Sequence, residues 1–213
     1  MMKFLEYYLI RHVGDAPQTA ARVKGFLRTV GYEPMHWVRA VMYEKCSELI
    51  SELGPERLDV CEISAGNEWR SRFNFKSYTE LNYPEFDICK QASDRQFDLV
   101  IADNVFEHLL YPYRAARNVL KMLRPGGYFL NITPFMIRVH AVPTDCSRWT
   151  EEGMKYFLEE CGFDAARMIS GSWGNRACVK ANFPKWARVG FSSSMKNEPD
   201  FPVQVWVLAR APS

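Results

Sequence analysis

The sequence lacks the features that mark several large classes of protein. Its six cysteines form no CxxC pair, which argues against a cysteine metal site, and we expect no metal ion. No apolar run approaches the ~20 residues that a membrane-spanning helix needs. The N-terminal residues 1–13 are interrupted by charges and show no small-residue cleavage site, so we expect no secretory signal. These absences favour a reduced, cytoplasmic protein without membrane association.

An excess of charge of either sign is also absent. The 27 basic and 25 acidic residues are interspersed and give a net charge of +2. A general nucleic-acid binder would carry a basic stripe, so we expect no nucleic-acid partner. Internal repeats and low-complexity tracts are missing too. A chain of 213 residues, 47% of them hydrophobic, is long enough for one α/β domain with a large core.

The most informative stretch present is LDVCEISAGN, residues 58–67. The short apolar run Leu58–Ile63 is rich in β-branched residues and ends at turn formers, which predicts a buried strand. In open α/β sheets, ligands bind outside the carboxyl ends of the strands. Glu62 and Gly66 stand at such an end, and we therefore consider this turn a candidate nucleotide site. A glycine turn after an ordinary strand is the alternative.

A second acidic residue supports the nucleotide interpretation. The segment Lys76–Leu81 predicts another strand, and Glu80 near its end lies eighteen positions after Glu62. An acid about 20 residues past the first turn can accept hydrogen bonds from both hydroxyls of a ribose. A solvated glutamate at a strand end is the alternative.

The middle of the chain predicts a parallel sheet. Phe97–Ala102 is apolar at every position except Asp98, as expected for a central strand that is buried on both faces. A helix beginning near Pro112 and a strand at Tyr128–Thr133 complete a strand–helix–strand unit. Phe86–Ile88 would form one further short strand.

Residues 1–57 are expected to form an N-terminal helical extension or cap, and residues 58–213 the main domain. Apolar residues at helical spacing predict helices over 17–31 and 34–54, which either pack on the sheet or form a lid over a ligand.

The C-terminal third is expected to contain a helix and two strands. Thr150 is the expected cap of the helix. The strands are predicted near Ala165–Ser170 and Val203–Arg210, with residues 171–202 as an insertion between them.

Three segments together resemble the type-11 class I S-adenosylmethionine-dependent methyltransferases. They are FDLVIADNVFEHL (97–109), KMLRPGGYF (121–129) and DCSRWTEEGMKYFLEECGF (145–163). The resemblance covers about half of the chain and implies an α/β fold: a doubly wound, mostly parallel, seven-stranded Rossmann-like sheet with its last strand antiparallel. It also implies S-adenosylmethionine as the cofactor.

The resemblance further implies which residues bind that cofactor. The methionine end would lie at the first turn, the ribose and nucleoside at the end of the second strand, the adenine at the reduced segment 87–91, and the rest along the loop after the central strand. These residues are Glu62, Ser64, Gly66, Glu80, Leu81, Asp87, Asp103, Asn104, Val105 and His108.

The chain departs from the family pattern at two places. Where the family has three glycines in its first motif, this chain has Ser64, Gly66 and Glu68. The acidic-Leu-Pro segment that holds the adenine in the family is missing. A chain that kept the fold but lost catalysis, as a binding or scaffold protein, is therefore one alternative. A Rossmann oxidoreductase is less favoured because the turn lacks G-x-G-x-x-G.

Methyl transfer is an in-line displacement, and it needs a base when the acceptor keeps its proton. His140 and Asp145 are our candidates for this base and its orienting partner. A loop histidine bonded to backbone and an aspartate capping a turn are the alternatives; for His108, a role in orienting its own loop is favoured.

The function expected from all of this is methyl transfer from S-adenosylmethionine to an oxygen or nitrogen of a small molecule. A sugar, a glycan precursor or a secondary metabolite would be the acceptor. The sequence leaves the oligomeric state open, with a homodimer among the alternatives.

Overall fold

The computed structural model describes residues 35–190 and 193–213, so the helix expected over 17–31 lies outside the described residues. A six-stranded sheet runs through the molecule in the order β2-β1-β3-β4-β6-β5. Strands β1 to β4 are parallel, and β6 is antiparallel to both of its neighbours. The strands are β1 (Asp59–Ile63), β2 (Ser77–Leu81), β3 (Phe97–Asp103), β4 (Leu123–Pro134), β5 (Ile169–Trp173) and β6 (Gln204–Arg210).

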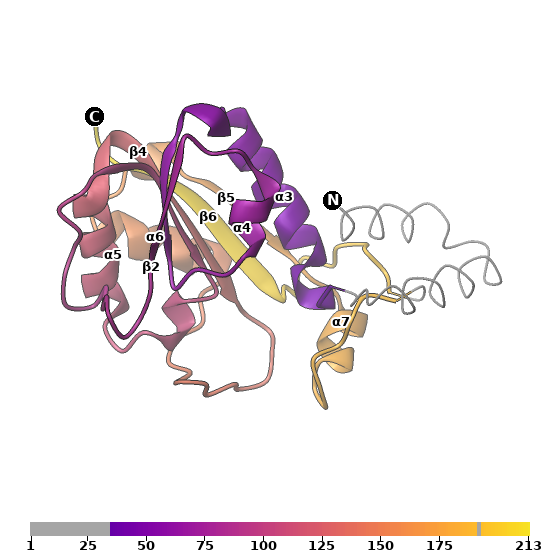
Figure 1. The fold of residues 1–213 in the computed structure, drawn as a ribbon. Coiled ribbons are helices and arrows are strands. Elements are labelled where there is room, and N and C mark those ends of the chain that lie inside the picture. The colour runs from indigo at the N-terminus through magenta and orange to yellow at the C-terminus, as the bar shows by residue number, and fades with distance from the viewer. Residues whose placement is uncertain (1–34, 191–192) are drawn as a thin grey trace.

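Helices cover both faces of this sheet (Figure 1). Helix α3 packs on one face together with the cluster that contains Leu130 and Ile132, and α5 and α6 pack on the other. The helices are α3 (Ala40–Glu52), α4 (Glu68–Arg72), α5 (Pro112–Met122), α6 (Glu151–Glu160) and α7 (Arg176–Ala181). Four short 3-10 turns accompany them in the described part: η1 (Trp37–Arg39), η2 (Pro55–Arg57), η3 (Phe106–His108) and η4 (Ala165–Arg167).

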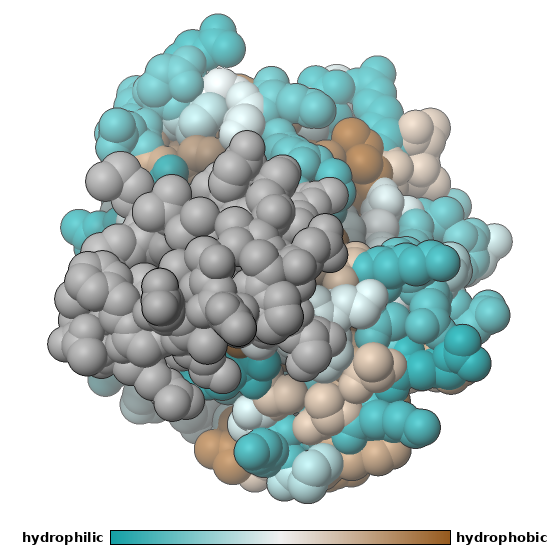
Figure 2. All heavy atoms as spheres, turned by 90° about the vertical axis from the view of Figure 1, so that its right-hand side faces the viewer, coloured by the Kyte–Doolittle hydropathy of each residue, from teal (hydrophilic) through white to brown (hydrophobic). Residues whose placement is uncertain are grey.

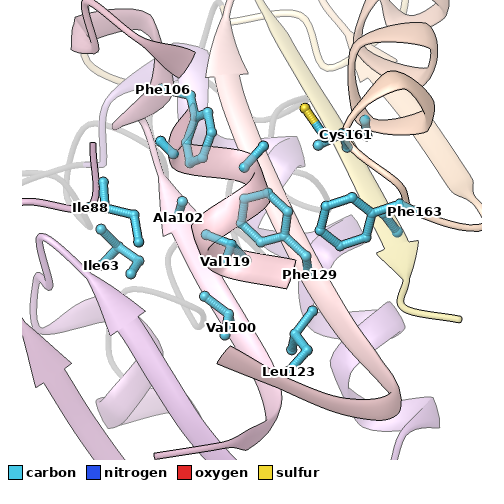
Figure 3. Packing of buried hydrophobic residues seen from close by; sticks show 14 of the residues in the cluster. Ile63, Ile88, Val100, Ala102, Phe106, Val119, Leu123, Phe129, Cys161 and Phe163 are labelled. Atoms are coloured by element: carbon cyan, nitrogen blue, oxygen red, sulfur yellow. The ribbon is translucent and has the colours of Figure 1, made fainter. Parts of the chain in front are cut away.

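The core on the α5 and α6 side fixes the loop that follows β3. Phe106 lies in that loop, is fully buried, and its ring centroid is 5.4 Å from that of Phe129 on β4. Phe129 in turn stacks on Phe163 at 5.7 Å (Figure 3). Because interiors are close-packed, a buried aromatic here leaves the loop little freedom to move. The polar residues beside Phe106 are therefore held in place.

The doubly wound α/β class and the antiparallel inserted strand are confirmed, and the number of strands is corrected. Phe86–Ile88 is not a strand, since Phe86 and Asp87 are irregular and a turn begins at Ile88, so the sheet has six strands in the described residues. Ile88 is buried all the same, and its carbonyl accepts a hydrogen bond of 2.8 Å from Asn118 Nδ2 on α5. Packing of Ile88 and Phe86 in the hydrophobic cluster that contains α5 residues, and not sheet pairing, explains why this segment is apolar.

Two boundaries also differ from expectation, and the insertion contains a helix. β4 begins at Leu123, so the RPGG segment belongs to the strand and does not precede it. β5 begins at Ile169, because Asp164 caps the 3-10 turn η4 through its side chain. The insertion after β5 contains α7, capped by Asn175. The cap expected at Thr150 is confirmed, since its Oγ1 accepts from the Gly153 N–H at 3.1 Å.

Among the described residues, the structure contains no helix with the length and apolarity to cross a membrane. In the described part of the surface seen in Figure 2, hydrophilic side chains predominate and the hydrophobic ones form separate small areas.

Candidate functional site

The two predicted glutamates lie side by side at the carboxyl ends of β1 and β2. Glu62 and Glu80 are partners in the parallel register of these strands. Glu62 is 2% exposed; its Oε1 accepts from the Gly66 N–H at 3.3 Å and its Oε2 from the Tyr78 hydroxyl. Burial raises the pKa of Glu62 to about 7. This carboxyl group therefore changes its charge near neutral pH.

The turn after β1 has the backbone conformation that favours glycine. Ser64 has a φ of +53°, and its N–H donates to the Leu81 carbonyl at 2.9 Å. A Cβ added at Gly66 would meet no atom within 4 Å, so the turn leaves open space beside Gly66. The family's glycine at position 64 is thus explained by backbone geometry, and the serine occupies the same conformation with some strain.

Replacing Ser64 by glycine should relieve this strain. We expect the Ser64→Gly variant to have a free energy of unfolding within about 1 kcal/mol of the original protein, because the relieved strain is offset by the greater entropy of glycine in the unfolded chain. Ser64→Val, whose branched side chain tolerates positive φ poorly, should lose more than 1 kcal/mol. Urea unfolding curves of the three proteins measure both changes; a valine variant as stable as the glycine variant would contradict the assignment.

The residues predicted to bind the nucleoside make contacts with other residues of the protein. The Glu80 side chain is 34% exposed and pairs with Arg70 of α4, whose Nη1 lies 3.1 Å from Oε1. Leu81 pairs in register with Ile63 and is partly buried. Asp87 lies in the turn after β2, where its Oδ1 accepts from the Cys89 N–H at 2.9 Å.

Asp103 ends β3 and holds two helices to the sheet. Its Oδ2 accepts from the Tyr43 hydroxyl of α3 at 3.0 Å and from Trp69 Nε1 of α4 at 3.1 Å. The next residue, Asn104, has a φ of +54°, and its Nδ2 donates to Asp103 Oδ1 at 2.6 Å. Two residues with positive φ, Ser64 and Asn104, therefore follow neighbouring strands at the same edge of the sheet.

The loop after β3 also borders a cavity of about 300 Å³. Val105 is buried at 6% exposure, and His108 lines the cavity wall. The wall joins segments that are far apart in the sequence: His36, Val38, Arg39, Asn104, Glu107, His108, Pro134, Ile137, His140, Trp186 and Gln204. Three predicted site residues, Asn104, His108 and His140, thus come together here.

His140 lies on this cavity, with its ring centroid 4.9 Å from that of His108 and 5.5 Å from that of Trp186. Burial and the neighbouring His108 lower the pKa of His140, so its imidazole is neutral at physiological pH. Asp145 accepts from the backbone N–H of His140 at 2.9 Å and pairs with Arg148. Burial acts to raise the pKa of Asp145, but these hydrogen bonds outweigh it and lower the pKa. The contact to His140 is made through its backbone.

Glu107 is an ionisable residue of this cavity wall that was not among the predicted site residues. Its side chain is fully buried, and burial raises its pKa to about 8. Neither of its oxygens takes a hydrogen bond in the described structure. The EH pair in the loop that follows a buried strand was the available signal. Gln204 and Trp186 carried no local signal, because tertiary folding alone brings them to the wall.

Comparison with known proteins agrees with this architecture. Residues 46–129 match a protein family described as a methyltransferase domain. A segment of 88 residues is 32% identical to a highly reducing polyketide synthase of Alternaria alternata; it covers 38% of this chain and 3% of that protein. Solved S-adenosylmethionine-dependent methyltransferases from Clostridium acetobutylicum and Archaeoglobus fulgidus both align with a TM-score of 0.53.

Residues 46–129 thus resemble a methyltransferase domain, and the described chain shares the fold of solved S-adenosylmethionine-dependent methyltransferases. The Clostridium structure is 11% identical and aligns over 92% of this chain and 99% of its own. The Archaeoglobus structure is 14% identical over 87% and 97%. A Haemonchus contortus phosphoethanolamine N-methyltransferase in complex with S-adenosyl-L-methionine, 11% identical with a TM-score of 0.53, aligns over 80% of this chain and 53% of its own. At these identities the solved structures show the fold of the methyltransferase domain.

Proposed function

We propose that this protein transfers the methyl group of S-adenosylmethionine to an oxygen or nitrogen of a small molecule. The observation that carries the proposal is the pairing of Glu62 and Glu80 at neighbouring strand ends, next to the glycine-like turn at Ser64. A carboxylate at each position is suited to bind one end of the cofactor, the ammonium group at Glu62 and the ribose hydroxyls at Glu80. The matched methyltransferase domain supports this arrangement.

The acceptor would bind in the cavity beside His140. A volume of about 300 Å³ is at the lower end of the range for small-molecule sites, which favours a small acceptor. Its oxygen or nitrogen attacks the methyl carbon, the sulfur–carbon bond breaks, and the sulfur leaves as a neutral thioether. Holding the three atoms in line supplies much of the rate. For a hydroxyl acceptor, the neutral His140 imidazole can take up the proton.

A sugar, a glycan precursor or a secondary metabolite would suit this wall, because Arg39 and Gln204 offer polar groups beside the aromatic Trp186. Gln204 Nε2 donates to Asn104 Oδ1 at 3.1 Å, and its Oε1 takes no hydrogen bond within the described structure. A hydroxyl group of the acceptor would satisfy this oxygen. A homodimer and a role of residues 1–57 as a cap over the acceptor are parts of the same proposal.

Calorimetric titration separates this function from its rivals. We expect S-adenosylmethionine and S-adenosylhomocysteine to bind at micromolar levels and NAD not to bind. Binding of NAD alone would favour an oxidoreductase. Binding of none of the three would favour a scaffold protein that kept the fold and lost catalysis.

Removing the carboxylate proposed to bind the ribose should weaken the binding of the cofactor. We expect the Glu80→Ala variant to bind S-adenosylmethionine more than tenfold more weakly, about 1.4 kcal/mol, because the ribose hydroxyls lose their acceptor. Arg70→Ala is the matched control: it removes the ion pair to Glu80 but keeps the carboxylate, so affinity should be equal or higher. Equal affinities in the original protein and the Glu80→Ala variant would remove Glu80 from the site.

A further inference from the structure

Glu107 presents a buried carboxyl group that the protein itself does not satisfy. It is 0% exposed, and both of its oxygens lack a hydrogen-bond partner in the described structure. Burying such a group without a partner costs several kcal/mol at least, so its position calls for a ligand. The nearest ionisable atom is His108 Nε2, which lies 3.6 Å from Oε1. This distance is too long for a hydrogen bond but is close to the separation of two ligands on one metal ion, roughly 3–3.5 Å.

The tautomer of His108 is fixed by its other ring nitrogen. Nδ1 faces the carbonyl oxygen of Thr144 at hydrogen-bond distance, and since a carbonyl can only accept, Nδ1 carries the proton. Nε2 is then left with a lone pair that points toward Glu107. A backbone carbonyl that orients the imidazole in this way is the usual outer partner of a metal-binding histidine.

His140 supplies a third possible metal ligand close to Glu107 and His108. Ligand atoms of Glu107, His108 and His140 all lie within 4.8 Å of one another, so small side-chain rotations would bring all three onto one ion. The backbone around them is held in place. The Glu107 carbonyl accepts from the Cys146 N–H at 2.7 Å, and the His108 carbonyl accepts from Thr144 Oγ1 at 2.6 Å. The two loops that carry the donors are thereby fastened together.

We propose that Glu107, His108 and His140 bind a divalent transition-metal ion. Two imidazoles and one carboxylate form a donor set that suits Zn²⁺ or Fe²⁺ and leaves at least one coordination position open. All three residues line the 300 Å³ cavity, so the open position faces the space where an acceptor would bind. The proposal replaces the expectation from cysteine spacing that the chain binds no metal, because carboxylate and histidine ligands from distant segments leave no such spacing.

A metal ion here would define the acceptor more closely, a consequence that rests on the proposed function. A hydroxyl oxygen of the acceptor would complete the coordination and lose its proton to water more easily, because the cation lowers its pKa. That oxygen then bonds to the methyl carbon as the sulfur–carbon bond breaks, and S-adenosylhomocysteine leaves. His140 would act as a ligand and not as the base. The class of acceptor is then a molecule with a hydroxyl group that can coordinate a metal ion.

Titration of the metal-stripped protein with Co²⁺ tests the site without any methyl transfer. After treatment with EDTA, the full chain should bind one equivalent of Co²⁺ with the visible absorption of a protein-bound ion, and Zn²⁺ should displace it. Mg²⁺, which prefers oxygen ligands, should compete poorly. Glu107→Gln and His140→Ala should each weaken Co²⁺ binding more than tenfold. His36→Ala, which removes another histidine of the same cavity wall, should change it less than threefold.

Circular dichroism of each variant checks that it is folded before the titration. Absence of a stoichiometric Co²⁺ complex, or equal binding by the original protein, Glu107→Gln and His140→Ala, would overturn the proposal. Binding of the metal without binding of S-adenosylmethionine would leave the metal site standing and refute the proposed function. Binding of S-adenosylmethionine without binding of the metal would refute the metal site and leave the proposed function standing.

Discussion

Replacing Trp69 by alanine is expected to lower the free energy of unfolding by about 4 kcal/mol, the typical cost of removing a fully buried tryptophan. Trp69 lies on the short helix α4 and is 0% exposed. Its ring packs edge-on against Tyr43 of α3 with centroids 5.3 Å apart, and its Nε1 donates to Asp103 at the end of β3. Trp69 therefore joins the helix after the first turn to two other elements, and alanine would leave a cavity among all three.

Urea unfolding followed by far-ultraviolet circular dichroism measures this change, because fluorescence would still report on the other five tryptophans. Trp69→Phe is the matched control. It keeps most of the ring and removes the Nε1 donor, and we expect a loss of about 1–2 kcal/mol, mainly from the unpaired hydrogen-bonding capacity of Asp103. A cost below 1 kcal/mol for the alanine variant would mean that α4 contributes little to stability and that the turn at Ser64 is held by other contacts.

Local patterns in the sequence were sufficient for most of the sheet. The mainly apolar runs at Leu58–Ile63 and Phe97–Ala102 became β1 and β3 within one residue, because a short run with few polar residues matches a strand that is largely buried. The same reasoning was wrong for Phe86–Ile88. There Ile88 is buried and Phe86 partly buried in the hydrophobic cluster that includes residues of helix α5, and burial leaves the same sequence signal whether or not a strand forms.

The candidate site divides in the same way. The pairing of Glu62 with Glu80 follows from strand order and spacing, which local sequence carries. The cavity could not be predicted in this way. It brings together residues that are far apart in the sequence and that no periodicity relates: His108 after β3, His140, Trp186 and Gln204. His140 and His108 were singled out by resemblance to a family. Glu107 gained its importance only when the fold showed that it is buried without a hydrogen bond.

Lowering the pH from 7.5 to 5.5 is expected to weaken the binding of S-adenosylmethionine by about twentyfold, if the ionised form of Glu62 holds the cofactor's ammonium group. The pKa of Glu62 is raised to about 7 by burial, so the carboxylate that attracts the cation is lost as the pH falls through 7. The cofactor's amino group, with a pKa near 8, stays mostly charged over this interval. Calorimetry at each pH measures the change. Glu62→Gln is the control, and its weaker affinity should vary much less with pH.

The contribution of Glu62 to the free energy of unfolding should increase as the pH falls, whereas the affinity for the cofactor decreases. This difference distinguishes protonation of Glu62 from general unfolding in acid. A carboxyl group whose pKa is higher in the folded than in the unfolded chain binds more protons when folded, so its stabilising contribution is full below pH 4.5 and is lost as the pH rises through 7. At pH 8 the ionised Glu62 therefore costs stability, and the Glu62→Gln variant should be more stable than the original protein by about 3 kcal/mol. Near pH 4.5 the two should be equal. Two results would contradict this account: a glutamine variant that is less stable than the original protein at pH 8, or an affinity of the original protein that does not change with pH. Either result would show that Glu62 is already ionised and that its charge is balanced by neighbouring groups. Protonation of Glu62 could not then control the binding of the cofactor.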